Sequence, residues 1–114
     1  LLSDGDALPP QTEGFIQALA EKNALLLTQT LVPMEKWKRD QLLPVLQQWQ
    51  QIIADALSCR AGLPAMSGEA RRLGEVRDPR DLSRIHSALR KAAEYTQSNV
   101  SPAAVCGWLA WELR

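Results

Sequence analysis

Residues 40–59 read Asp40-Gln41-Leu42-Leu43-Pro44-Val45-Leu46-Gln47-Gln48-Trp49-Gln50-Gln51-Ile52-Ile53-Ala54-Asp55-Ala56-Leu57-Ser58-Cys59 and carry the clearest pattern in the chain. Each residue of a helix turns by roughly 100°, and at this step the large apolar side chains fall on one half of a helical wheel. Gln47, Gln48, Gln51 and Asp55 fall on the other half. The pattern therefore predicts an amphipathic helix over about 40–59 with its apolar face toward a core.

The ends of this helix also carry recognisable signals. Asp40 is the expected N-cap, and Pro44 is tolerated because it falls early in the helix. Gly62 and Pro64 end the pattern, since glycine favours a helix C-terminus and proline cannot continue a helix.

Two further helices are expected before residue 40. Phe15, Ile16 and Leu19 recur at helical spacing and predict a short helix over about 11–21. Asn23 is the expected N-cap of a second helix, which Pro33 ends or kinks because it forces the preceding residue out of the helical region.

The second half of the chain carries two strong start signals. Asp78-Pro79 and Ser101-Pro102 each place a capping oxygen before a proline at the first helical position. They predict helices over 79–98 and from residue 101 to 114. The stretch 60–77 between the two halves is rich in glycine and is the loosest of the chain, although Ser67 could cap one or two turns through Leu73.

Composition agrees with an all-α fold. The chain has 114 residues, with 18 Leu and 15 Ala against 13 of Val, Ile and Thr together. Leu and Ala favour helices and β-branched residues favour sheets, so we expect a small bundle of about five helices. The expected core comprises Leu42, Leu46, Trp49, Ile53, Leu57, Leu82, Ile85, Leu89, Val105 and Leu109.

The chain is short enough for one domain. Residues 1–10 have the composition of a linker from a missing N-terminal module, and residues 11–114 form the helical domain. The sequence opens without Met and lacks the layout of a signal peptide. Cys59 and Cys106 have no CxxC spacing, so we expect two reduced thiols in a cytoplasmic protein, with a disulfide between them as the alternative.

The sequence lacks the sets of residues that catalysis, metal binding and nucleotide binding need. His86 is the single histidine, and no nearby nucleophile or orienting carboxylate completes a catalytic set. One His and two isolated Cys make no metal-ligand set, and neither GxxxxGK[ST] nor GxGxxG occurs. We therefore expect no catalytic residue, metal, nucleotide or other cofactor in this chain. No apolar run approaches the roughly 20 residues that span a membrane.

Basic residues gather within 71–91, where Arg77, Arg80 and Arg84 form a candidate weak basic face. Such a face could steer DNA or an acidic partner toward the chain. The alternative is that these arginines are solvated helix flanks paired with Glu75, Asp78 and Asp81. The 13 acidic residues equal the 13 basic ones, which excludes a strongly basic nucleic-acid binder.

The last helix is apolar on nearly every side. Val105 and Leu109 cover one side, while Ala104, Trp108 and Trp111 cover the adjoining side. A helix of this kind is buried on more than one face. Aromatic residues are enriched at the centres of interfaces, so Trp108, Trp111 and Ala104 are the candidate subunit interface. The alternative is that the first two helices of the same chain fold over this patch.

The order of these elements resembles a known family. Glu35-Lys36-Trp37-Lys38-Arg39-Asp40-Gln41-Leu42-Leu43 leads into the Leu/Trp-rich helix, and Ile85-His86-Ser87-Ala88-Leu89-Arg90-Lys91-Ala92-Ala93-Glu94-Tyr95 follows a variable loop. Asn99-Val100-Ser101-Pro102 then precedes the apolar last helix and is the most telling part. Over residues 11–114 the chain resembles the C-terminal domain of bacterial DNA polymerase III clamp-loader subunits, most closely the delta-prime type. The Gly/Pro loop at 60–68 departs from the family pattern.

The resemblance implies a collar domain, which packs with the corresponding domains of other subunits into a ring. The implied partners are the gamma/tau and delta subunits, and the assembled loader places the sliding clamp on primed DNA. A delta-prime subunit does not itself hydrolyse ATP, and gamma/tau, which has a similar collar domain, is the other subunit type that the resemblance allows. A second hypothesis from the residues is a free-standing helical adaptor or weak DNA-binding module that uses the 71–91 basic region.

Overall fold

The computed structural model describes residues 10–62 and 68–113, and this part of the chain forms helices without any strand. The elements are α2 (Pro10–Glu21), α3 (Ala24–Leu31), a short 3-10 helix η1 (Val32–Lys36), α4 (Arg39–Arg60), α5 (Gly68–Val76), α6 (Pro79–Gln97) and α7 (Pro102–Glu112). The expected all-α fold is therefore confirmed. Of the expected linker at 1–10, residues 1–9 lie outside the described residues, as does the expected cap at Ser67, and Pro10 is the first residue of α2.

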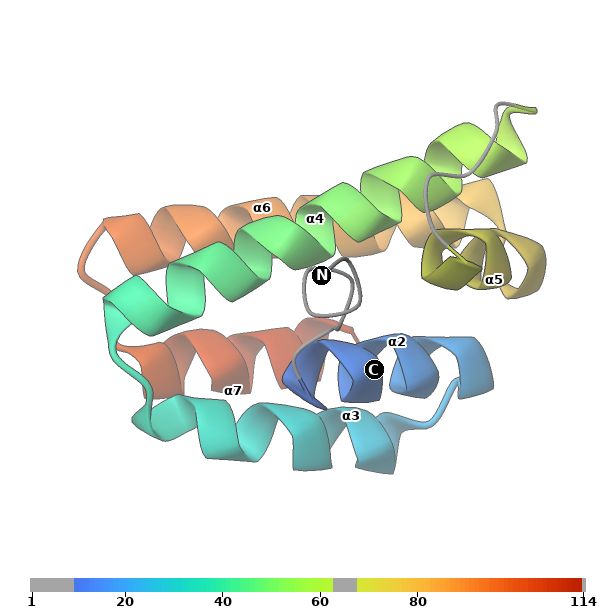
Figure 1. Ribbon diagram of the computed structural model, residues 1–114. Coiled ribbons are helices and arrows are strands. Elements are labelled where there is room, and N and C mark those ends of the chain that lie inside the picture. The colour runs from blue at the N-terminus through green and yellow to red at the C-terminus, as the bar shows by residue number, and fades with distance from the viewer. Residues whose placement is uncertain (1–9, 63–67, 114) are drawn as a thin grey trace, which may run out of the picture.

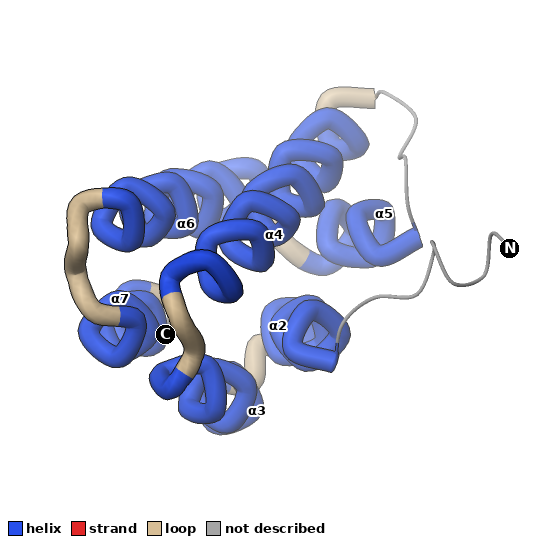
Figure 2. The backbone as a smooth tube through the Cα atoms, turned by 60° about the vertical axis from the view of Figure 1, so that its left-hand side comes forward, coloured by secondary structure: helices blue, strands red, loops and turns tan. Residues whose placement is uncertain are grey.

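The helices form two layers (Figures 1 and 2). α4 and α6 run antiparallel in one layer, and α5 packs against the C-terminal half of α4. α2, α3 and α7 form the other layer, which η1 joins to α4 at one end. α7 contacts α6, α3 and η1, so the last helix holds the two layers together.

The described part of the chain contains six α-helices, whereas about five were expected from the sequence. The difference is α5, which runs on to Val76 where only one or two turns were expected. Ala70 and Leu73 of α5 are buried. Gly74 lets α5 approach α4 closely, because a Cβ at this position would lie 3.1 Å from the carbonyl oxygen of Ala56. Tertiary packing of this kind stabilises a helix whose local sequence signal is weak.

Three of the expected helix caps are confirmed by their hydrogen bonds. The side-chain oxygens of Asn23, Asp78 and Ser101 accept from backbone N–H groups three residues later, at 3.0, 2.9 and 3.2 Å. The expected cap at Asp40 is wrong. α4 begins at Arg39, so Asp40 lies inside the first turn and Lys38 is the N-cap; the side chain of Gln41 accepts a hydrogen bond from the backbone N–H of Lys38.

The core lies between the two layers and matches the expected set with one exception. Nine of the ten expected residues are buried. Leu57, in the last turn of α4, is only partly buried and packs at the edge of the core. Phe15 of α2 stacks on Trp49 of α4 with ring centroids 4.0 Å apart and planes 3° from parallel, so the two layers meet through an aromatic pair.

A buried hydrogen-bond chain accompanies this stacked pair. The indole Nε1–H of Trp49 donates to the hydroxyl of Thr12 at 2.9 Å, and that hydroxyl donates to the side-chain oxygen of Gln48 at 2.8 Å. Both Thr12 and Trp49 are fully buried. The threonine hydroxyl therefore satisfies a polar group that cannot reach water.

Replacing Thr12 by Val should destabilise the domain by about 1–3 kcal/mol, because valine keeps the shape but leaves the buried indole N–H without an acceptor. Thr12→Ser keeps the hydroxyl and serves as the control. Urea unfolding of both variants measures the difference. Equal midpoints for the two variants would show that this hydrogen bond does not stabilise the fold.

Candidate functional site

α7 presents two different faces, one buried and one largely exposed. Val105, Cys106 and Leu109 point into the core and are fully buried. Ala104 is exposed, Trp108 is partly buried and Trp111 is 68% exposed. These three positions are spaced i, i+4 and i+7, so they lie along one side of the helix. We call Ala104, Trp108 and Trp111 the α7 outer face.

The α7 outer face borders a shallow hollow of about 320 Å³. The hollow is lined by Tyr95 and Val100 from the α6 end of the bundle and by Ala104, Val105 and Trp108 from α7. Tyr95 and Trp108 meet edge to face, with ring centroids 5.3 Å apart and planes 83° from each other. This arrangement is a favourable aromatic geometry, and it holds the Trp108 ring in place beside the opening.

Sequence reasoning missed Tyr95 as part of this site. The residue falls off the apolar stripe of the 79–98 helix, and 38% of it is exposed. Its contact with Trp108 depends on the turn between α6 and α7. Asn99 in this turn adopts a left-handed conformation (φ 71°), and its carbonyl oxygen accepts a 2.6 Å hydrogen bond from the Arg39 guanidinium. An exposed tyrosine just before an Asn-containing turn was the signal that could have indicated it.

The chain itself covers part of α7. α3 and η1 pack against it, and Leu31 and Met34 from these elements are buried. This cover resembles the alternative in which the first helices fold over the apolar patch. It buries Trp108 in part and leaves Trp111 mostly exposed, so the described part of the chain covers the α7 outer face only partly.

The candidate basic face does not present three equivalent arginines. Arg77 has a side chain only 9% exposed; its Nε donates to the carbonyl oxygen of Leu19 at 2.9 Å, and its Nη1 pairs with Asp81 at 2.7 Å. Arg84 donates to the carbonyl oxygen of Glu112 at 2.7 Å and lies 3.4 Å from Asp81. Arg80 is exposed. Arg77 therefore connects Asp81 of α6 with the end of α2, and Arg84 connects α6 with the end of α7.

Asp81 forms ion pairs with both Arg77 and Arg84. Burial by itself would raise its pKa, but the hydrogen bonds and positive charges of Arg77 and Arg84 outweigh burial and hold the pKa of Asp81 below its ordinary value. The folded state therefore favours the carboxylate. The resulting stability is present at neutral pH and is lost as the pH falls through the lowered pKa.

Replacing Asp81 by Asn should lower the free energy of unfolding at pH 7 by about 0.5–1 kcal/mol, a typical value for a partly exposed ion pair. The same variant should lose less stability than the wild type when the pH falls from 5 to 2. Asp40→Asn, at an exposed position, is the control. Chemical unfolding across this pH range gives the comparison, and identical pH profiles for wild type and Asp81→Asn would contradict the assigned role.

Other reactive side chains are dispersed in the fold. His86 is partly buried, and Cys59 and Cys106 are free. Burial, helped by the negative charge of Glu35, raises the pKa of Cys106 to about 12, so this thiol stays protonated at neutral pH. Over residues 10–62 and 68–113 the His, Cys, Asp and Glu side chains form no group of three that could hold a metal ion. No helix in the same ranges is long and apolar enough to cross a membrane.

Comparison with known proteins found no relative of this chain. No family model, curated protein or solved structure matches the chain. Among the described residues, the α7 outer face with its adjoining hollow combines an exposed tryptophan with an aromatic-walled opening.

Proposed function

We propose that this chain is a C-terminal collar domain of a DNA polymerase III clamp loader, of the delta-prime type. In this role it packs with gamma/tau and delta subunits so that the complex can load the sliding clamp on primed DNA. The observation that carries the proposal is the α7 outer face, where Trp111 is 68% exposed on the same side of the helix as Ala104 and Trp108, which line an aromatic-walled hollow. The sequence resemblance over residues 11–114 supplies the identity of the partners.

Physical chemistry supports an interface on this face. A tryptophan buries more apolar surface than most side chains when a partner covers it, and tryptophans are enriched among the residues that dominate binding energy. Trp108 is already oriented by Tyr95, so binding would order few side chains. The exposed neighbours Ala104 and Gly107 carry little bulk, and a Cβ added at Gly107 would meet no atom within 4 Å. A partner helix could therefore approach α7 closely.

The role proposed is structural and cytoplasmic. Under this proposal the chain performs no catalytic step, binds no nucleotide or other cofactor, and makes no essential DNA contact. The arrangement of the arginines agrees with it, because Arg77 and Arg84 are engaged within the chain. The alternative is an adaptor or weak DNA-binding module that uses the 71–91 basic region, whose exposed basic residues are Arg71, Arg72, Arg80, Arg84, Arg90 and Lys91.

Sedimentation velocity tests the proposal. The chain is mixed with purified gamma/tau and delta clamp-loader subunits from the same source, and we expect it to sediment with them as a larger species. A mobility-shift assay on primed and duplex DNA runs in parallel, where we expect weak binding at physiological salt. If the chain sediments alone and binds duplex DNA tightly in a salt-sensitive manner, the alternative replaces the proposal.

A further inference from the structure

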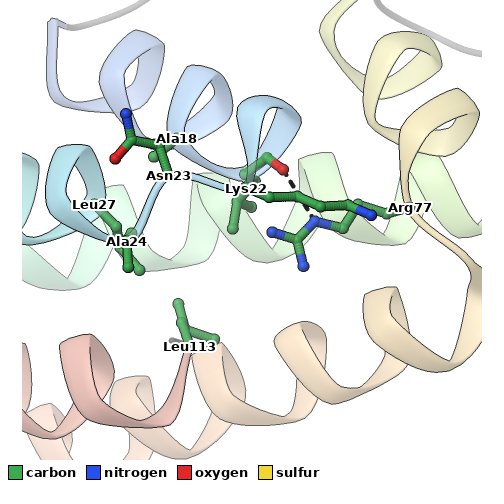
Figure 3. Close-up of a pocket in the computed structure, with 8 residues that line it drawn as sticks. Ala18, Lys22, Asn23, Ala24, Leu27, Arg77 and Leu113 are labelled. Carbon is green, nitrogen blue, oxygen red and sulfur yellow. Dashed lines mark hydrogen bonds between the residues drawn. The ribbon is translucent and has the colours of Figure 1, made fainter.

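A second hollow, separate from the α7 outer face, lies where the α2–α3 turn meets the end of α7. Its volume is about 160 Å³, and its walls come from α2, α3, the residue after α5 and the residue after α7. Figure 3 shows the Arg77 guanidinium reaching the end of α2, with the Leu113 side chain, just after α7, pointing toward the α2–α3 turn. The lining residues are Ala18, Leu19, Lys22, Asn23, Ala24, Leu27, Arg77 and Leu113.

The charged residues of this lining are both positive. Lys22 is exposed at the rim, and Arg77 is nine-tenths buried. The Arg77 guanidinium uses Nε for the Leu19 carbonyl oxygen and Nη1 for Asp81, while its Nη2 makes no hydrogen bond within the described residues. Every fully buried side-chain nitrogen of the described residues has a hydrogen-bond partner. Because Nη2 has no such partner, it must be in contact with solvent. The hollow therefore offers a fixed donor and a second, movable cation to an anionic group.

The rest of the lining is mostly apolar. Ala18, Leu19, Leu27 and Leu113 are all buried to at least 97%. An inorganic oxyanion would contact the two cations but would leave this apolar wall covered only by water, which is unfavourable. A ligand with a carboxylate at one end and a short hydrocarbon at the other would satisfy both parts of the hollow.

We propose that this hollow is a binding site for a short-chain monocarboxylate with a tail of about three to five carbons. The size agrees, because a protein cavity of about 150 Å³ holds a benzene molecule. The carboxylate contacts Arg77 Nη2 and the Lys22 ammonium as charge-assisted hydrogen bonds, and the tail lies against Leu27 and Leu113. The inference goes beyond the assembly role and does not depend on it.

Titration of the ¹⁵N-labelled chain with isovalerate, followed by NMR, tests the site. Isopentanol supplies the tail without the charge, and sulfate supplies the charge without the tail. Lys22→Asn removes the rim cation and suits the left-handed conformation of this residue (φ 55°). Ala24→Leu, at an exposed lining position, fills the opening. Lys36→Asn removes an exposed lysine outside the lining and is the matched control.

We expect isovalerate to produce saturable shifts at residues around the hollow, with a dissociation constant in the millimolar range. Lys22→Asn should weaken binding about five- to tenfold, Ala24→Leu should abolish it, and Lys36→Asn should leave it unchanged. Melting curves confirm that each variant is folded. The proposal is overturned if isovalerate gives no saturable shift, if sulfate or isopentanol binds equally well, or if Lys22→Asn and Ala24→Leu both bind like the wild type.

Discussion

The Ile53→Asp variant should melt at least about 15 °C below the wild type, or fail to fold. Ile53 lies mid-way along α4 and is fully buried. An aspartate there would place a charge without a partner in the core, which ranks among the most destabilising single changes at about 4 kcal/mol or more. A domain of this size has a total stability of only about 5–15 kcal/mol. Thermal unfolding followed by circular dichroism measures the shift.

Gln51→Asp is the matched control for this experiment. It introduces the same residue two positions away on the exposed side of α4. We expect its melting temperature to change by only a few degrees. A melting temperature for Ile53→Asp close to that of Gln51→Asp would remove Ile53 from the core and contradict the packing of the two layers.

Replacing Trp111 by Ala should weaken assembly with the clamp-loader partners about thirtyfold without lowering the melting temperature. Truncation of a tryptophan at the centre of an interface commonly removes about 2 kcal/mol or more of binding free energy. Because Trp111 is mostly exposed, its loss leaves little new cavity in the isolated domain. The dissociation constant of the complex, measured by sedimentation or fluorescence titration, gives the binding change.

Leu25→Ala is the control for Trp111→Ala. Leu25 of α3 is also 68% exposed, so the two variants remove apolar side chains of equal exposure from different elements. We expect Leu25→Ala to bind normally. Equal weakening by the two variants would indicate nonspecific apolar contact rather than an interface on α7, and a collapsed melt of Trp111→Ala would assign this tryptophan to the fold of the domain.

Local sequence signals predicted most of the helices because they act over a few residues. Asn23, Asp78 and Ser101 cap the helices they were expected to cap, since each bonds a backbone group only three positions away. Asp40 is not the cap because α4 begins one residue earlier than expected, which makes Lys38 the N-cap residue. The full length of α5 was not predictable, because its stability depends on Gly74 meeting α4 across the fold.

The α7 outer face was predictable in the same local sense, while its surroundings were not. Spacing alone places Ala104, Trp108 and Trp111 along one side of a helix. The edge contact of Tyr95 with Trp108 depends on how α6 turns into α7. Likewise, Arg77 reads as one more surface arginine in the sequence, and only the tertiary fold brings its guanidinium to the end of α2.

Oxidative footprinting of the assembled complex tests the central claim most directly. Hydroxyl radicals modify exposed side chains, and mass spectrometry compares Trp111 with Leu25 in the free chain and in its mixture with gamma/tau and delta subunits. We predict that assembly strongly protects Trp111 and leaves Leu25 as reactive as before. Unchanged oxidation of Trp111 in a complex that has formed, or failure of the complex to form, would contradict the assignment of the α7 outer face as the collar interface.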